Sequence, residues 1–126
     1  MKKFAAALVI FVAIEHIYFL VLEMFFWTKP LGMKTFGLTP EFAAQSASLA
    51  ANQGLYNGFL AAGLLFGLLR SKGAVGTQVF FLCCVVVAGV FGAITAKATI
   101  LYVQAAPALL ALIVVLLAHR RDSDLL

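Results

Sequence analysis

The sequence predicts an all-α, polytopic membrane protein in which four transmembrane helices form an antiparallel bundle. Hydrophobic residues make up 64% of its 126 residues and charged residues only 11%. Soluble domains use roughly 45–50% apolar residues, so a soluble fold of this chain would not cover its own surface. The mean hydropathy of +1.08 agrees with this, and a chain of this length predicts a single domain over residues 1–126.

Apolar stretches of about 20 residues, the length that crosses a bilayer, predict the four helices. They cover about residues 4–27, 47–69, 75–95 and 100–118. The first follows a charged start typical of a secretory signal, but no small-residue cleavage site follows it, so we interpret it as an uncleaved helix. Short connections between such helices favour a bundle. Gly54 with Gly58, and Gly63 with Gly67, have the spacing that lets membrane helices approach closely.

The stretch 28–46 is predicted to be a loop on the outer side, because it contains prolines and glycines that favour turns. Within it, Thr39 and Pro40 have the order of an N-cap and a first helical residue, which favours a short helix there.

The distribution of lysine and arginine predicts the orientation. One side of a four-helix arrangement carries Lys2, Lys3, Arg70, Lys72, Arg120 and Arg121, and the other carries Lys29, Lys34 and Lys97. We therefore expect both termini in the cytoplasm and the stretch 28–46 outside. The net charge of +4 is scattered at helix ends, which indicates contact with lipid headgroups and no nucleic-acid binding.

The segment "FVAIEHIYFLVLEMFFW" carries Glu15, His16 and Glu23 inside a predicted membrane helix. His16 and Glu23 are seven residues apart, about 20° from alignment on an α-helix, and Trp27 continues that face. Ionisable residues inside membranes indicate function by default. A buried carboxylate such as Glu15 has to be protonated, paired or hydrated. The competing interpretation of Glu23 and Trp27 is that they are interface residues.

The second predicted helix contains "LAANQGLYNGFLA". Asn52 and Tyr56 are four residues apart, as are Gln53 and Asn57, so each pair lies along one face of the helix. The fourth adds Tyr102 and Gln104 near its outer end. These polar groups lie between the membrane midplane and the outer surface, which predicts a pocket above an apolar floor. The competing interpretation is that they only join helices.

A histidine and a carboxylate in such a pocket exchange protons with a bound substrate, or ligate a metal or haem. Glu15 and His16 are therefore the candidate catalytic pair. The candidate ligand-binding residues are Glu23, Trp27, Asn52, Gln53, Tyr56, Asn57, Tyr102 and Gln104. The adjacent Cys83 and Cys84 lack the spacing of a zinc site, so we predict no metal site.

Three segments resemble a known family: "AIEHIYFLVLEMFFW", "LAANQGLYNGFLAAGL" and "VQAAPALLALIV". They are similar to bacterial membrane proteins of domain-of-unknown-function family 1304, from Phe11 to about Leu117. The resemblance implies a small four-helix inner-membrane protein and brings no settled activity. The His and Glu pattern is also similar to that of sterol-isomerase-like membrane proteins. "NQGLYNG" is similar to the haem segment of styrene-oxide isomerase, with Asn52 where the ligating histidine would stand, so haem would bind through His16.

Three functions follow from these observations. The first is binding, with acid/base isomerisation as the chemistry, of a lipophilic small molecule. The second is a small proton-coupled transporter or exporter that works as a dimer. The third is a structural or accessory membrane subunit, whose polar residues pair across an interface, including that of a homo-oligomer. No nucleotide loop, nucleophile elbow or HExxH sequence is present.

Overall fold

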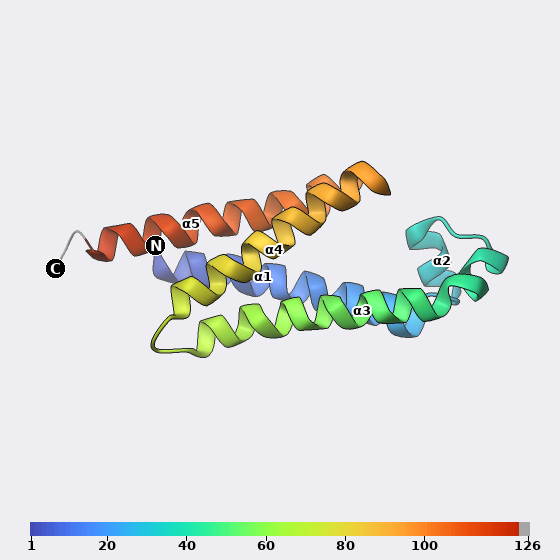
Figure 1. Cartoon of the computed structure of the whole chain (residues 1–126), viewed down its shortest axis with the longest axis horizontal. Coiled ribbons are helices and arrows are strands. Elements are labelled where there is room, and N and C mark those ends of the chain that lie inside the picture. Colours follow the sequence, from blue (N-terminus) through green and yellow to red (C-terminus); the bar gives the residue numbers. More distant parts are fainter. Residues whose placement is uncertain (124–126) are drawn as a thin grey trace. The chain divides into compact units, whose positions relative to one another are not determined.

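The computed structural model describes residues 1–123, and this part of the chain is all-helical, with no strand (Figure 1). Five α-helices and two π-helical turns follow one another. They are α1 (Lys2–Val21), η1 (Leu22–Phe26), α2 (Pro30–Phe36), α3 (Pro40–Leu69), α4 (Ala74–Thr95), η2 (Leu101–Ala105) and α5 (Ala106–Ser123).

Three of the described helical segments are long and apolar enough to cross a membrane: Lys2–Phe26, Ala74–Thr95 and Leu101–Arg120. They correspond to the first, third and fourth predicted spans, whose membrane character is therefore supported. The second predicted span lies within α3 and does not meet the same criterion. The amide side chains and glycines of α3 lower the mean hydropathy of every stretch of this helix that is long enough to cross a membrane. A fourth membrane span therefore remains a prediction.

The stretch expected to be an outer loop, 28–46, is largely helical. Pro30 stands at the start of α2, and Gly37 ends that helix in the left-handed conformation, with φ of 69°. Thr39 then accepts a hydrogen bond from the Phe42 amide at 3.3 Å, as an N-cap does. The helix that begins at Pro40 continues without a break to Leu69. The cap was predictable, but the helix is longer than expected because no breaker separates it from the apolar run.

The chain divides into two compact units, and α1 and α3 each contribute to both. The first unit contains Met1–Ala13 and Ala62–Leu126, and the second is Ile14–Ala61. Each is described by itself.

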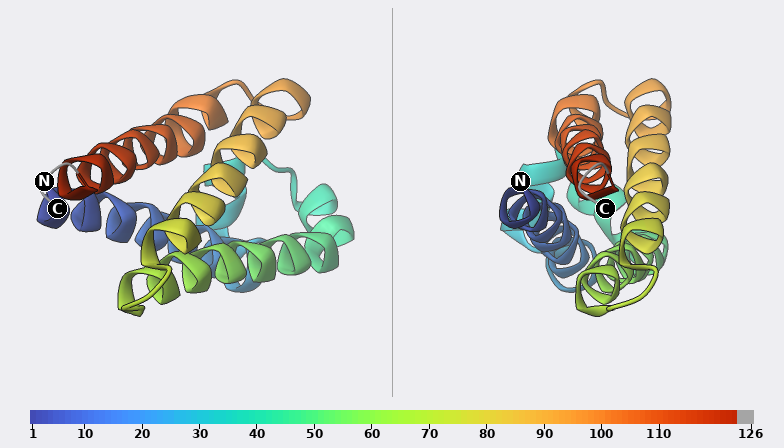
Figure 2. Two further views of the ribbon diagram at one scale, coloured as in Figure 1. Left: turned by 60° about the vertical axis from the view of Figure 1, so that its left-hand side comes forward. Right: turned by 90° about the vertical axis from the view of Figure 1, so that its left-hand side faces the viewer.

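In the first unit, α5 returns along α4 after a short turn (Figure 2). The two segments approach closely at Gly89, where an added Cβ would lie 2.8 Å from the Ala105 backbone nitrogen. The turn itself is held by backbone hydrogen bonds, among them one from the Ile100 amide to the Lys97 carbonyl at 3.0 Å. Leu82 and Val85 of α4 have no exposed surface and form part of the core.

The end of α3 packs against the start of α4 in the same unit. Gln78 is buried and donates a hydrogen bond from Nε2 to the Gly67 carbonyl at 3.2 Å. The chain reverses at Gly73, whose φ of 71° suits glycine. A cavity of about 260 Å³ in this unit is lined from four helical segments, with Lys2, Leu68, Val75 and His119 among its residues. The start of α1, the end of α3, the start of α4 and the end of α5 therefore meet at one end of the first unit.

Candidate functional site

The candidate site lies in the second unit, where the last turns of α1 and η1 pack on the middle of α3. Glycine permits this approach: an added Cβ at Gly54 would lie 2.7 Å from Met24 Cγ and 3.2 Å from the Leu20 carbonyl oxygen. At Gly58 it would lie 2.6 Å from Leu20 Cδ1. The spacing of Gly54 and Gly58 indicated close packing from the sequence, and these contacts show which helix they meet.

A hydrogen bond between two polar side chains joins the helices at this point. Asn57 donates from Nδ2 to Glu23 Oε2 over 2.7 Å. Asn57 is only 6% exposed, and Glu23 is partly buried. Because the alternative to such a bond inside a bilayer is an unsatisfied carboxyl group, the pair holds η1 and α3 together. The structure thus brings together two of the predicted site residues that are far apart in sequence.

The π-helical turn Leu22–Phe26 changes the face on which Trp27 lies. A π turn closes its hydrogen bonds one residue later than an α turn, so residues after it are rotated from their ideal α-helical positions. Trp27 donates from Nε1 to Ser46 Oγ at 3.0 Å, and its ring lies 4.8 Å from that of Phe36. The expectation that Trp27 simply continues the face of His16 and Glu23 assumed an unbroken α-helix, which the chain does not have here.

Glu15 and His16 lie farther along α1 from this hydrogen bond. At a rise of 1.5 Å per residue, Glu15 is about 12 Å from Glu23 along the helix axis. His16 has no exposed surface, and its ring contacts Phe19 edge-on with 5.8 Å between centroids. Glu15 is partly exposed, yet its Oε2 is buried without a hydrogen-bond partner among residues 1–123.

The remaining predicted site residues are more accessible. Asn52, Gln53 and Tyr56 are exposed on α3, and the Tyr56 ring contacts Phe59 of the same helix with 6.2 Å between centroids. Tyr102 is 73% exposed and Gln104 partly so, and both belong to the first unit. Their roles as ligand-binding residues stay predictions.

Haem ligation through His16 does not fit the structure, because an imidazole without exposed surface offers no face to a porphyrin iron. Within the described residues, no three His, Cys, Asp or Glu side chains are grouped so that they could hold a metal ion.

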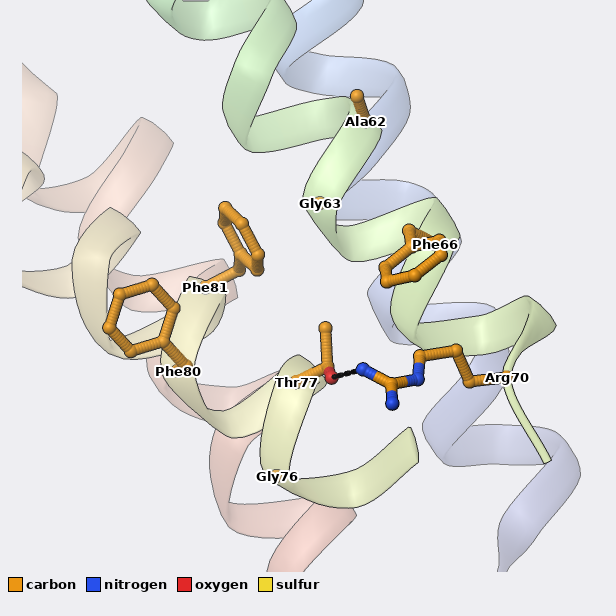
Figure 3. Close-up of a pocket in the computed structure, with 8 residues that line it drawn as sticks. All are labelled: Ala62, Gly63, Phe66, Arg70, Gly76, Thr77, Phe80 and Phe81. Atoms are coloured by element: carbon orange, nitrogen blue, oxygen red, sulfur yellow. Dashed lines mark hydrogen bonds between the residues drawn. The ribbon is translucent and has the colours of Figure 1, made fainter. Parts of the chain in front are cut away.

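Two features of the structure were absent from the sequence-based site. Ser46 fixes the Trp27 indole, and its hydroxyl also donates to the Phe42 carbonyl at 2.6 Å. A serine near the start of a helix gives no distinct signal of this role. The other feature is a groove in the first unit between α3 and α4, lined by aromatic residues and Arg70 (Figure 3).

The fold and the buried polar pair define a small helical protein with membrane-length helices. The family model described as "Protein of unknown function (DUF1304)" matches residues 10–116, and the chain belongs to this family. A relative is "Uncharacterized protein YpaA" of Lactococcus lactis subsp. lactis (strain IL1403). It is 29% identical over 104 residues, which cover 81% of this chain and 87% of the relative. No solved structure matches the chain. The resemblance seen in the three sequence segments is thereby confirmed.

Proposed function

We propose that this protein binds a lipophilic small molecule at an intramembrane site centred on Glu15 and His16. The observation that carries the proposal is the buried Oε2 of Glu15, which has no hydrogen-bond partner in the described part of the chain. A carboxyl oxygen in such a position costs free energy unless a proton or a ligand group satisfies it. A hydroxyl or amine on an otherwise apolar molecule supplies that partner.

The Glu23–Asn57 pair supports this site from one side. Because Asn57 satisfies the Glu23 carboxyl at 2.7 Å, the pair fixes the distance between η1 and α3. Glu15 is then the acidic group on α1 that remains for a ligand, with His16 next to it in sequence. In this proposal Glu23 and Asn57 are positioning residues, and the ligand contacts are completed by Trp27, Asn52, Gln53 and Tyr56 of the same unit.

Acid/base isomerisation is the chemistry that these two groups would perform. The partly exposed Glu15 carboxyl would exchange a proton with the ligand, and the buried His16 imidazole would take part only after the side chains that cover it move aside. The protein would then move a double bond or open a strained ring of the ligand.

For the membrane arrangement we propose a four-helix antiparallel bundle in the bacterial inner membrane, with α3 as the second span and both termini in the cytoplasm. The cavity lined by Lys2, Leu68, Val75 and His119 supports this, because it groups four helix ends that the arrangement assigns to one side. The six cations of the positive-inside count lie at or near these four ends.

A second candidate function is that of a structural subunit, and the Glu23–Asn57 bond itself favours it. Polar pairs of this kind join membrane helices without binding anything. The exposed amides of Asn52 and Gln53 would then face a second copy of the chain or another membrane protein, since amides both donate and accept hydrogen bonds.

Native mass spectrometry of the protein released from detergent separates the two functions. We expect an additional bound mass on the wild type that is lost in Glu15→Gln and His16→Ala. Glu41→Gln is the matched control, because it removes an exposed carboxylate from the first turn of α3 and should keep the mass. No bound mass in any form, with His16→Ala falling from oligomer to monomer, would contradict ligand binding and support the structural function.

A further inference from the structure

The first unit contains an open groove of about 620 Å³ between the end of α3 and the start of α4 (Figure 3). Its lining combines three aromatic rings and small residues with one cation. The lining residues are Ala62, Gly63, Phe66, Arg70, Gly76, Thr77, Phe80 and Phe81. The volume falls within the range of ligand sites, roughly 300–1,000 Å³. None of these residues belongs to the site of the proposed function, and the inference does not depend on it.

Two glycines shape the groove. The Phe81 ring packs directly over Gly63, so that an added Cβ there would collide with it. At Gly76, by contrast, an added Cβ would meet nothing within 4 Å. Gly76 lies one turn before Phe80 on the same helix, and its missing side chain leaves this part of the groove empty.

Arg70 is held at the end of the groove next to the α3–α4 turn. Its guanidinium lies over the Phe66 ring, with Cζ 5.3 Å from the centroid, and Nη1 donates to Thr77 Oγ1 at 3.4 Å. The Thr77 hydroxyl in turn donates to the Gly73 carbonyl at 3.1 Å. A guanidinium has five N–H groups, so one hydrogen bond to Thr77 leaves donors for an anion. Thr77 positions Arg70 and has no proton left for a ligand.

The positive charge of the groove indicates an anionic ligand. No lining residue is acidic, and the turn that follows Arg70 adds Lys72. An apolar groove with a cation at one end is complementary to a molecule that has an apolar chain and a negative head. Arg70 lies in the turn just before α4, a helix that is long and apolar enough to cross a membrane. Basic residues at the ends of such helices meet the phosphates of lipid headgroups.

We propose that this groove binds an anionic phospholipid of the bilayer. The phosphate accepts hydrogen bonds from Arg70, and an acyl chain lies against Phe66, Phe80 and Phe81. The open side of the groove lets the rest of the lipid continue into the membrane. Free phosphate would gain only the exposed guanidinium, whereas a lipid adds van der Waals contacts between its acyl chain and the three aromatic rings.

Native mass spectrometry with added phosphatidylglycerol and phosphatidylcholine of equal chain length tests the proposal. We expect the wild type to retain phosphatidylglycerol at least about tenfold more strongly, a difference of about 1.4 kcal/mol. Arg70→Gln should abolish this preference. Lys72→Gln removes the neighbouring cation, which does not line the groove, and should largely keep it.

A second pair of variants tests the groove itself. Gly76→Leu should reduce retention of phosphatidylglycerol although Arg70 is intact, because the new side chain occupies the empty space. Ala88→Leu adds the same side chain on an exposed part of α4 outside the groove and should have no effect. Equal retention of both lipids by the wild type, unchanged preference in Arg70→Gln, unchanged binding in Gly76→Leu, or displacement of phosphatidylglycerol by millimolar inorganic phosphate would each overturn the proposal.

Discussion

Replacing Asn57 with leucine removes the donor that satisfies the Glu23 carboxyl, and we expect the second unit to become less stable. The two side chains are joined over 2.7 Å, and Asn57 is only 6% exposed. Leucine has the same number and branching of side-chain heavy atoms as asparagine but cannot donate a hydrogen bond. The partly buried Oε2 of Glu23 would then lose the hydrogen bond that it now accepts from Asn57.

The expected magnitude follows from two terms. Hydrogen bonds between membrane helices contribute about 0.6 kcal/mol on average and at most about 1.7 kcal/mol. Leaving a buried acceptor unsatisfied costs about 1–3 kcal/mol. Asn57→Leu should therefore lower the free energy of unfolding by about 1–3 kcal/mol. Glu23→Gln retains an oxygen that accepts from Asn57 and should cost less than about 1 kcal/mol.

The assay is reversible unfolding in mixed micelles with an increasing fraction of sodium dodecyl sulfate. Trp27 is the only tryptophan of the chain, so its fluorescence reports the second unit directly. The double variant Glu23→Leu with Asn57→Leu closes a thermodynamic cycle, and we expect a coupling energy of about 1 kcal/mol. A coupling near zero, or a Glu23→Gln variant as unstable as Glu23→Leu, would refute the role assigned to this hydrogen bond.

Further predictions concern the packing around this bond. Gly54→Ala should destabilise by about 1–3 kcal/mol, since its Cβ would lie 3.2 Å from a backbone oxygen as well as 2.7 Å from Met24 Cγ. Gly58→Ala should cost less, because it meets only the movable end of a leucine side chain at 2.6 Å. Gly76→Ala, in open space, should be neutral or stabilising in the same unfolding assay. Ser46→Ala removes the acceptor of the Trp27 indole and should shift its emission maximum while lowering stability by no more than about 1 kcal/mol; an unchanged emission spectrum would contradict this contact.

Most of the helical architecture was predictable, because long apolar runs between charged and turn-forming residues set the helix ends within a few residues. The N-cap at Thr39 is likewise a local feature that the sequence displays. The π turn at Leu22–Phe26 was not predictable, since no residue type there distinguishes it from an α-helix. The length of α3 was underestimated because its polar first turns carry no breaker after Pro40.

The site was predictable as a set of residue types and less so as a set of contacts. Glu23 and Asn57 were singled out separately by their polarity within apolar runs, but their pairing depends on how η1 lies along α3. Helical periodicity relates residues on one helix and says nothing of the rotation of two helices against each other. The groove around Arg70 was missed for the same reason, because its parts come from two helices and its central feature, Gly76, has no side chain.

Binding of a small molecule at Glu15 is the central claim, and comparison of Glu15→Gln with Glu41→Gln tests it most directly. Both variants replace one carboxyl group by an amide of the same shape, so neither changes packing volume. The two variants are prepared in the same way from membranes of the same host and compared by native mass spectrometry. The fraction of protein that carries a bound small molecule should equal the wild-type fraction in Glu41→Gln and be at most about a tenth of it in Glu15→Gln. Equal occupancy in the two variants, or no bound molecule in either, would contradict the claim.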